Sequence, residues 1–168
     1  DYGNVPVQSQ DLSSLTNLVL GLKLSAGTGD VYLELQDASG AKSSVLLKGL
    51  GTTEQFYQVA LSLFSGVDLH TIASINLVVK HGVMPDTGTL SVRLGDIPYT
   101  PEVLHNSNLT SADVSHLSGL LQAVGFASKA PNGVGSAALT QLSGSELSLA
   151  YDVTNAESFG GVIATFDD

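Results

Sequence analysis

Apolar and polar residues alternate with a period of two along most of this chain, and the alternating stretches end at Gly, Pro, Asn or Asp. This pattern is typical of half-buried antiparallel strands joined by turns. The predicted strands lie at 18–24, 31–36, 45–47, 57–63, 75–79, 90–94, 147–153 and 161–166, with a weaker one at 137–142. We therefore predict an all-β fold, an antiparallel β-sandwich.

One segment shows a different spacing. Between 110 and 124 the apolar residues fall on one helical stripe, which predicts a short helix. Thr110 is placed to act as its N-cap and Gly125 to end it, with Asp113 near the positive end. Such a helix would cap the rim of the sandwich or dock a neighbour, and the first role is the more common one. The stripe consists of Val114, Leu117, Leu120, Leu121 and Val124.

Composition narrows the classes of partner. The chain has 168 residues, six basic and sixteen acidic side chains, and a net charge of -10. An acidic surface repels phosphate backbones and anionic lipids, so we expect no nucleic-acid partner and no membrane insertion. The chain contains no cysteine and begins with Asp1 rather than Met. We expect a mature form or an excerpt of a secreted or cell-surface protein, and a bacterial one because exported bacterial proteins often avoid cysteine.

Three stretches resemble the closing strands of a known family. They are 65–69 (SGVDL), 72–79 and 88–92 (GTLSV), while 15–24, 31–36 and 56–64 fit its middle strands. The family is that of galactose-binding-like jelly rolls, the non-catalytic carbohydrate-binding modules of secreted glycoside hydrolases. The resemblance implies a jelly-roll sandwich.

The order of the parts departs from that family. Its opening strands resemble 147–153 and 159–166, which come last here. We expect 1–100 to form the second part of the sandwich, 101–136 a helix and linker, and 137–168 the first strands of the same domain or of its neighbour. The chain could be circularly permuted, one repeat of a tandem array, or a subunit whose last strands complete the next subunit.

Catalytic patterns are weak. The four histidines, His70, His81, His105 and His116, form no metal-ligand spacing, and no serine lies in a nucleophile elbow. Sixteen acids make chance carboxylate pairs certain, and no spacing singles out a glycosidase pair. We expect no enzymatic activity.

Calcium is the best-motivated ligand, because hard cations prefer clustered oxygen donors. The alternative is a solvated acidic edge that discourages unwanted strand pairing. The candidate ligands are three acids at the chain ends and three donors on a nearby loop: Asp1, Asp167 and Asp168, with Asp152, Asn155 and Glu157.

Sugar binding would need exposed aromatic rings, and the chain has no Trp. Tyr2, Tyr32 and Tyr99 are the candidate carbohydrate platform, and Asn108 heads a triplet that matches an N-glycosylation acceptor. We expect a non-enzymatic extracellular structural protein, a β-sandwich repeat or subunit that self-associates end to end into a filament, fibre or adhesin stalk. The alternative is a carbohydrate-binding module.

Overall fold

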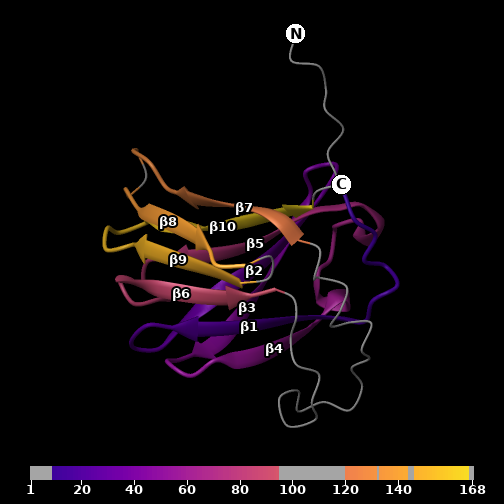
Figure 1. Cartoon of the computed structure of the whole chain (residues 1–168). Helices are drawn as coiled ribbons and strands as arrows, with labels where there is room; N and C mark the ends of the chain where they lie inside the picture. Colours follow the sequence, from indigo (N-terminus) through magenta and orange to yellow (C-terminus); the bar gives the residue numbers. More distant parts are fainter. Residues whose placement is uncertain (1–8, 95–119, 132, 144–145, 167–168) are drawn as a thin grey trace.

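The computed structural model describes residues 9–94, 120–131, 133–143 and 146–166, which form a two-layer β-sandwich (Figure 1). Every strand pair is antiparallel, and each layer is a five-stranded sheet. Sheet I has the order β4-β1-β6-β9-β8, and sheet II has the order β3-β2-β5-β10-β7. The predicted all-β antiparallel sandwich is confirmed.

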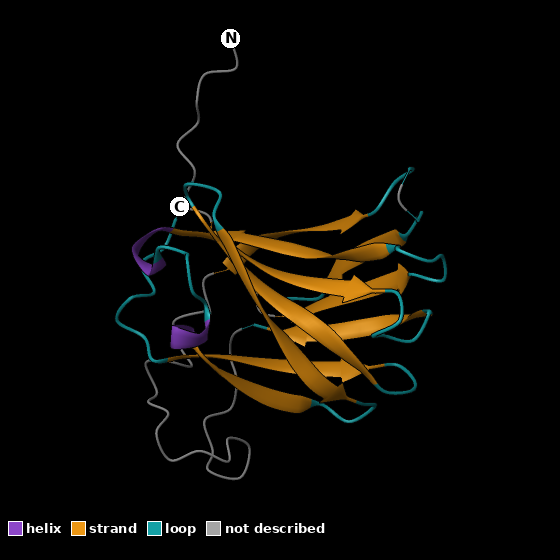
Figure 2. Ribbon diagram, turned by 180° about the vertical axis from the view of Figure 1, so that it is seen from behind, coloured by secondary structure: helices purple, strands orange, loops and turns teal. Residues whose placement is uncertain are grey.

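The strands of sheet I are β1 (Asn17–Leu24), β4 (Gln55–Ala60), β6 (Thr87–Arg93), β8 (Ser136–Gln141) and β9 (Glu146–Asp152). Those of sheet II are β2 (Gly29–Asp37), β3 (Lys42–Leu50), β5 (Ile72–Lys80), β7 (Leu120–Ala127) and β10 (Phe159–Phe166). Two single 3-10 turns, η1 (Leu61–Leu63) and η2 (Leu69–Thr71), lie at one end of the sandwich (Figure 2). Among the described residues, no helix has the length and apolar character needed to span a membrane.

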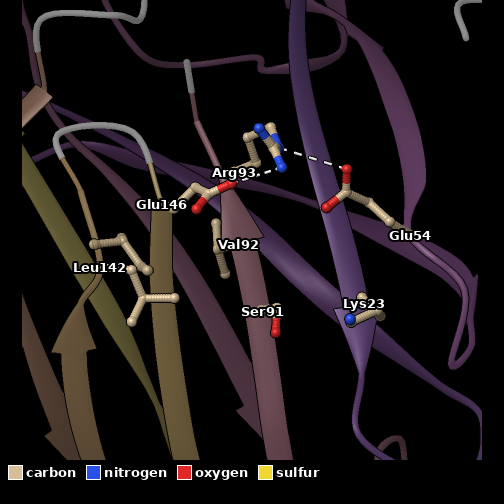
Figure 3. Close-up of a pocket in the computed structure, with 8 residues that line it drawn as sticks. Lys23, Glu54, Ser91, Val92, Arg93, Leu142 and Glu146 are labelled. Carbon is tan, nitrogen blue, oxygen red and sulfur yellow. Dashed lines mark ion pairs between the residues drawn. The ribbon is translucent and has the colours of Figure 1, made fainter. Parts of the chain in front are cut away.

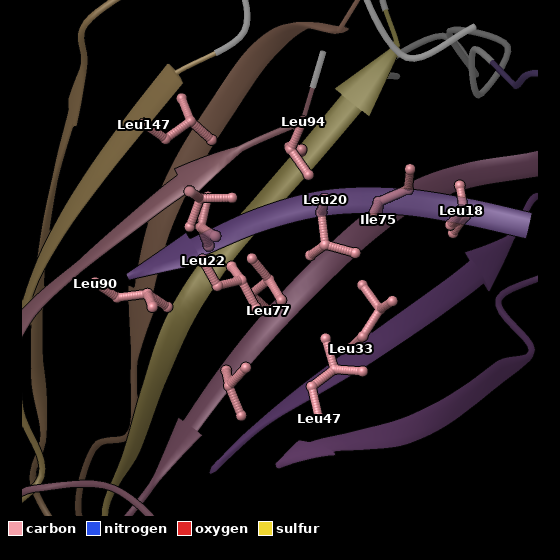
Figure 4. Close-up of a cluster of buried hydrophobic side chains, with 14 of the residues drawn as sticks. Leu18, Leu20, Leu22, Leu33, Leu47, Ile75, Leu77, Leu90, Leu94 and Leu147 are labelled. Atoms are coloured by element: carbon pink, nitrogen blue, oxygen red, sulfur yellow. The ribbon is translucent and has the colours of Figure 1, made fainter. Parts of the chain in front are cut away.

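Alternation places one set of side chains from each sheet in a shared core. From β1, Leu18, Leu20 and Leu22 point across the sandwich toward Leu33 and Leu77 of sheet II (Figure 4). These leucines are at most 1% exposed. At about 25 cal/mol per Å² of buried apolar area, this leucine-rich layer is the main source of stability.

The predicted helix at 110–124 is wrong where the structure describes it. Residues 120–124 belong to β7, where Val124 lies opposite Ile163 and Gly125 lies opposite Val162 of β10. Pairing with a central strand outweighs the weak helical spacing of the apolar residues. The part of the prediction at 110–119, with its N-cap Thr110, lies outside the described residues.

The predicted strand at 57–63 is too long at its C-terminal end. It ends at Ala60, and the chain turns through η1, which leaves Leu63 58% exposed rather than on the core face. Leu61 still enters the core.

The last two strands of the chain take interior positions. β9 lies between β6 and β8 in sheet I, and β10 lies between β5 and β7 in sheet II. At the start of β5, Ile72 bridges to Gln10 and Ser74 lies opposite Thr165. The first and last described segments therefore flank the same end of one strand.

Candidate functional site

The outer face of sheet II carries an apolar row that crosses all five strands. Strand register places Leu46 opposite Tyr32, Tyr32 opposite Val78, Val78 opposite Gly161, and Gly161 opposite Phe126. The four side chains of this row are partly exposed. We call these five residues the apolar row.

The two aromatic side chains of the apolar row, Tyr32 and Phe126, each contact neighbouring residues. The Lys80 ammonium lies 4.5 Å from the centroid of the Tyr32 ring. Phe126 covers Gly161, because a Cβ on that glycine would lie 2.8 Å from the phenyl ring and closer still to the Leu77 carbonyl oxygen. Phe126 also meets Phe159 with ring centroids 6.4 Å apart. Tyr32, the one described tyrosine of the predicted sugar platform, thus has a cation over its ring.

The outer face of sheet I also has a row of cross-strand neighbours, and this row contains charged side chains. Gly21 lies opposite Phe56 on one side and Arg93 on the other, and Arg93 lies opposite Glu146. Arg93 Nη2 is 2.6 Å from Glu146 Oε1, and Arg93 Nε is 3.5 Å from Glu54 Oε1 (Figure 3). One guanidinium therefore holds two carboxylates together.

A shallow hollow of about 200 Å³ opens beside this ion-pair network. Lys23, Ser91 and Leu142 complete its rim (Figure 3). Two cations and two carboxylates balance in charge, so the hollow suits a neutral polar ligand better than an ion. Its volume is below the roughly 300–1,000 Å³ typical of small-molecule pockets, which limits it to a small group.

A buried carboxylate secures one end of sheet II. Asp37 is 3% exposed, and its Oδ1 accepts hydrogen bonds from the Ser39 hydroxyl at 2.6 Å and from the backbone N–H groups of Ser39 and Ala41. Its Oδ2 accepts the N–H of Asp68 at 2.9 Å. The Ser39 hydroxyl first, and the Asp68 N–H next, hold the pKa of the Asp37 carboxyl at about 2. These four bonds make Asp37 a structural anchor.

The other end of the sandwich contains a buried phenol. Tyr151 is 4% exposed, faces Gly88 on β6, and its hydroxyl has no hydrogen-bond partner among the described residues. Burial, and secondly the charge of Asp86, raise the pKa of Tyr151 to about 12. Close by, His81 Nδ1 lies 2.8 Å from the Val153 carbonyl oxygen. A tautomer protonated at Nδ1 donates to the backbone there and leaves His81 a structural role.

Two of the three described candidate calcium ligands make hydrogen bonds within the protein. Asp152 Oδ1 accepts the N–H of Thr154 at 2.9 Å, and Asn155 Nδ2 donates to the Val134 carbonyl at 2.7 Å. Glu157 is exposed, with a left-handed backbone at φ 64°. Across the described part of the chain, no three His, Asp or Glu side chains are grouped as a metal ion requires. Asp1, Asp167 and Asp168 lie outside it, so the calcium site stays a prediction.

Several other candidates also fall outside the described residues, namely Tyr2, Tyr99, Asn108, His105 and His116. Of the two described histidines, His70 has its Nδ1 3.0 Å from Asp68 Oδ1 on the exposed turn η2. Sequence reasoning missed Arg93, Glu54 and Glu146. Alternation placed Arg93 on the polar face of the predicted strand 90–94, but Glu54 and Glu146 lay outside the predicted strands, and only the fold brings the three together.

Comparison with protein-family models, with curated proteins and with solved structures finds no match.

Proposed function

We propose that this chain is a non-enzymatic extracellular structural module that self-associates end to end into a filament, fibre or adhesin stalk. The observation that supports this most is the outer face of sheet II, where the apolar row crosses all five strands and a lysine lies over one of its rings. Contiguous exposed apolar patches mark interaction surfaces. We also propose that the sandwich is of the galactose-binding-like jelly-roll kind, as the resemblance of its sequence implies.

The polar chemistry of the described residues fits a structural role. Arg93 is paired with two glutamates, Asp37 is saturated by hydrogen bonds, and His81 lies against a backbone carbonyl. Each of these groups closes a contact between strands or loops. A general acid or base would instead need a proton-accepting atom aimed at a substrate cleft.

Sedimentation velocity over a range of protein concentrations, with negative-stain electron microscopy, tests the proposal. The expected result is a series of species larger than the 17.3 kDa chain, with elongated particles. A single 17.3 kDa species at every concentration would overturn it.

A carbohydrate-binding module is the second candidate, and the hollow beside Arg93 favours it. Its balanced charges offer fixed donors and acceptors to the hydroxyl groups of a neutral sugar. Titration of isotope-labelled protein with methyl β-glucoside and methyl β-galactoside tests it. Amide shifts at Ser91 and Glu146 that saturate, and that Lys23→Met weakens, would support this candidate, and unchanged spectra would exclude these sugars.

A further inference from the structure

We infer that the outer face of sheet II is the surface by which one copy of this chain docks on an acidic region of a second copy. The inference rests on the proposed function, since it names the partner and the surface used in self-association. Three observations carry it: an apolar centre, a basic rim, and the net negative charge of the chain as a whole.

The apolar centre runs across the whole sheet. With strands about 4.8 Å apart, the apolar row from Leu46 to Phe126 spans roughly 19 Å. On the β7 side it widens, because Val124, 58% exposed, lies opposite the partly exposed Ile163. Contiguous apolar patches of this kind on an outer sheet face mark interaction surfaces more often than scattered exposed leucines do.

Lysines lie around this centre. Lys80 covers Tyr32, Lys42 lies opposite Gln36, and Lys48 follows Leu46 by two positions on the outer side of the edge strand β3. Three of the six basic residues of the chain therefore lie on one face. An apolar centre with a polar rim is the usual anatomy of a protein interface.

The acids on this face are few and already engaged. Glu34 Oε1 pairs with Lys42 at 3.5 Å and accepts from Asn76 at 2.9 Å, and Asp30 accepts the N–H of Gly49 at 2.9 Å. The eight other acidic residues that the structure describes lie away from this face, and the net charge of the whole chain is -10. A second copy therefore offers the acidic surface that this basic face would attract.

The charges decide how the two copies meet. A face-to-face contact would set three lysines against three lysines, whereas a contact between this face and another surface pairs opposite charges. Contacts between two different surfaces leave a free surface at each end, so they propagate into filaments or close into rings. The outer face of sheet I is less suited, because its described cations are only Arg93, which Glu54 and Glu146 neutralise, and Lys23.

Two substitutions test the surface, each with a matched control. Val124→Glu places an acid in the apolar centre, and Leu142→Glu places one at a 63% exposed leucine beside sheet I. Lys80→Glu reverses a charge on the face, and Lys23→Glu reverses one on the outer side of sheet I. Association is measured by sedimentation velocity at low and high salt, and circular dichroism checks that each variant folds.

We expect Val124→Glu and Lys80→Glu to weaken association at least about tenfold, which is about 1.4 kcal/mol. The two controls should match the unmodified chain, and high salt should weaken association of that chain because salt screens charge attraction. If the chain associates but all four variants associate equally well, the inference is wrong while the proposed function stands. If the unmodified chain never associates, the proposed function itself fails.

Discussion

On both outer faces of this sandwich a phenylalanine ring covers a glycine of the neighbouring strand, but the residues around this pair differ between the two sheets. In sheet I, Gly21 on a central strand faces Phe56 on the edge strand β4, and in sheet II, Gly161 faces Phe126 on the edge strand β7. In each case the phenyl ring lies over the glycine, which replaces the missing side chain as a cover for the backbone. The next residue in the row is Arg93 in sheet I and Val78 in sheet II.

The inner faces of the two sheets serve packing, whereas the outer faces can differ in function. The inner faces of both sheets are leucine-rich and interchangeable in chemistry, because both must fill one core. The outer faces are free to differ, and they do: the row on sheet I pairs Arg93 with two glutamates, whereas the row on sheet II leaves apolar side chains at the surface with lysines beside them. The surface whose chemistry is not satisfied within the chain is the one to test for partners.

The largest expected effect is a difference in stability between alanine substitutions at the two glycines. A Cβ at Gly161 would clash with the backbone carbonyl of Leu77, which cannot move without disturbing β5, whereas a Cβ at Gly21 would lie 3.1 Å from the movable Phe56 ring. We expect Gly161→Ala to lower the free energy of unfolding by about 3 kcal/mol and Gly21→Ala by less than about 1 kcal/mol. Urea denaturation followed by circular dichroism measures both, and equal losses would show that the rings, not the backbone, limit the space.

Sequence alone predicted the inner faces well. A period of two is enough to assign Leu18–Leu24 or Leu33–Leu35 to one side, because the rule is local. The strand β7 was missed since Gly125 and the preceding leucines fit a helix end, and only β10 makes that segment a strand. The outer rows could not be predicted, because they depend on register between strands far apart in sequence, such as Val78 and Gly161.

Engineered disulfides sharpen the comparison between the two sheets. In each sheet, one disulfide would join a strand from the end of the chain, β9 or β10, to its neighbour from the first part of the chain, β6 or β5. The chain has no cysteine, so Ser91→Cys with Ser148→Cys would join β6 to β9, and Ser74→Cys with Thr165→Cys would join β5 to β10. Directly opposed residues in antiparallel strands are about 4.5–5.5 Å apart at Cα, within the range of a disulfide. We expect each bond to form within one chain and to stabilise it by about 2 kcal/mol.

Non-reducing electrophoresis and thermal unfolding read out the result. The docking surface on sheet II predicts that both locked proteins still associate, since no strand needs to leave its own sheet. Mixed disulfides between chains that carry only one cysteine each, one Ser91→Cys and the other Ser148→Cys, would instead indicate that β9 is exchanged between neighbours.

The pH dependence of stability tests the role of Asp37 at the end of sheet II, apart from the outer face of that sheet. Because the folded pKa of Asp37 is about 2, against an ordinary 3.8, its carboxylate stabilises the fold above pH 4, and this contribution is lost as the pH falls through about 2. We expect Asp37→Asn to lower the Tm at neutral pH, and the gap to the unmodified chain to narrow between about pH 4 and pH 2. Ser39→Ala, which removes one donor and keeps the carboxylate, should give a smaller gap, and parallel curves for Asp37→Asn would contradict this role.

The smallest expected effect compares two lysines on opposite faces. Lys80 lies over the Tyr32 ring at 4.5 Å, whereas Lys23 on sheet I forms no ion pair with any residue that the structure describes. A cation over an exposed aromatic ring contributes about 0.5 kcal/mol, so Lys80→Met should lower the free energy of unfolding by that amount and Lys23→Met should leave it nearly unchanged. Both are measured by urea denaturation at concentrations where the chain is monomeric. If the effect of Lys80→Met disappears in a chain that also carries Tyr32→Leu, the ring is the partner of this lysine; if the effect persists, Lys80 acts through the strand itself and Tyr32 is free to contact a neighbour.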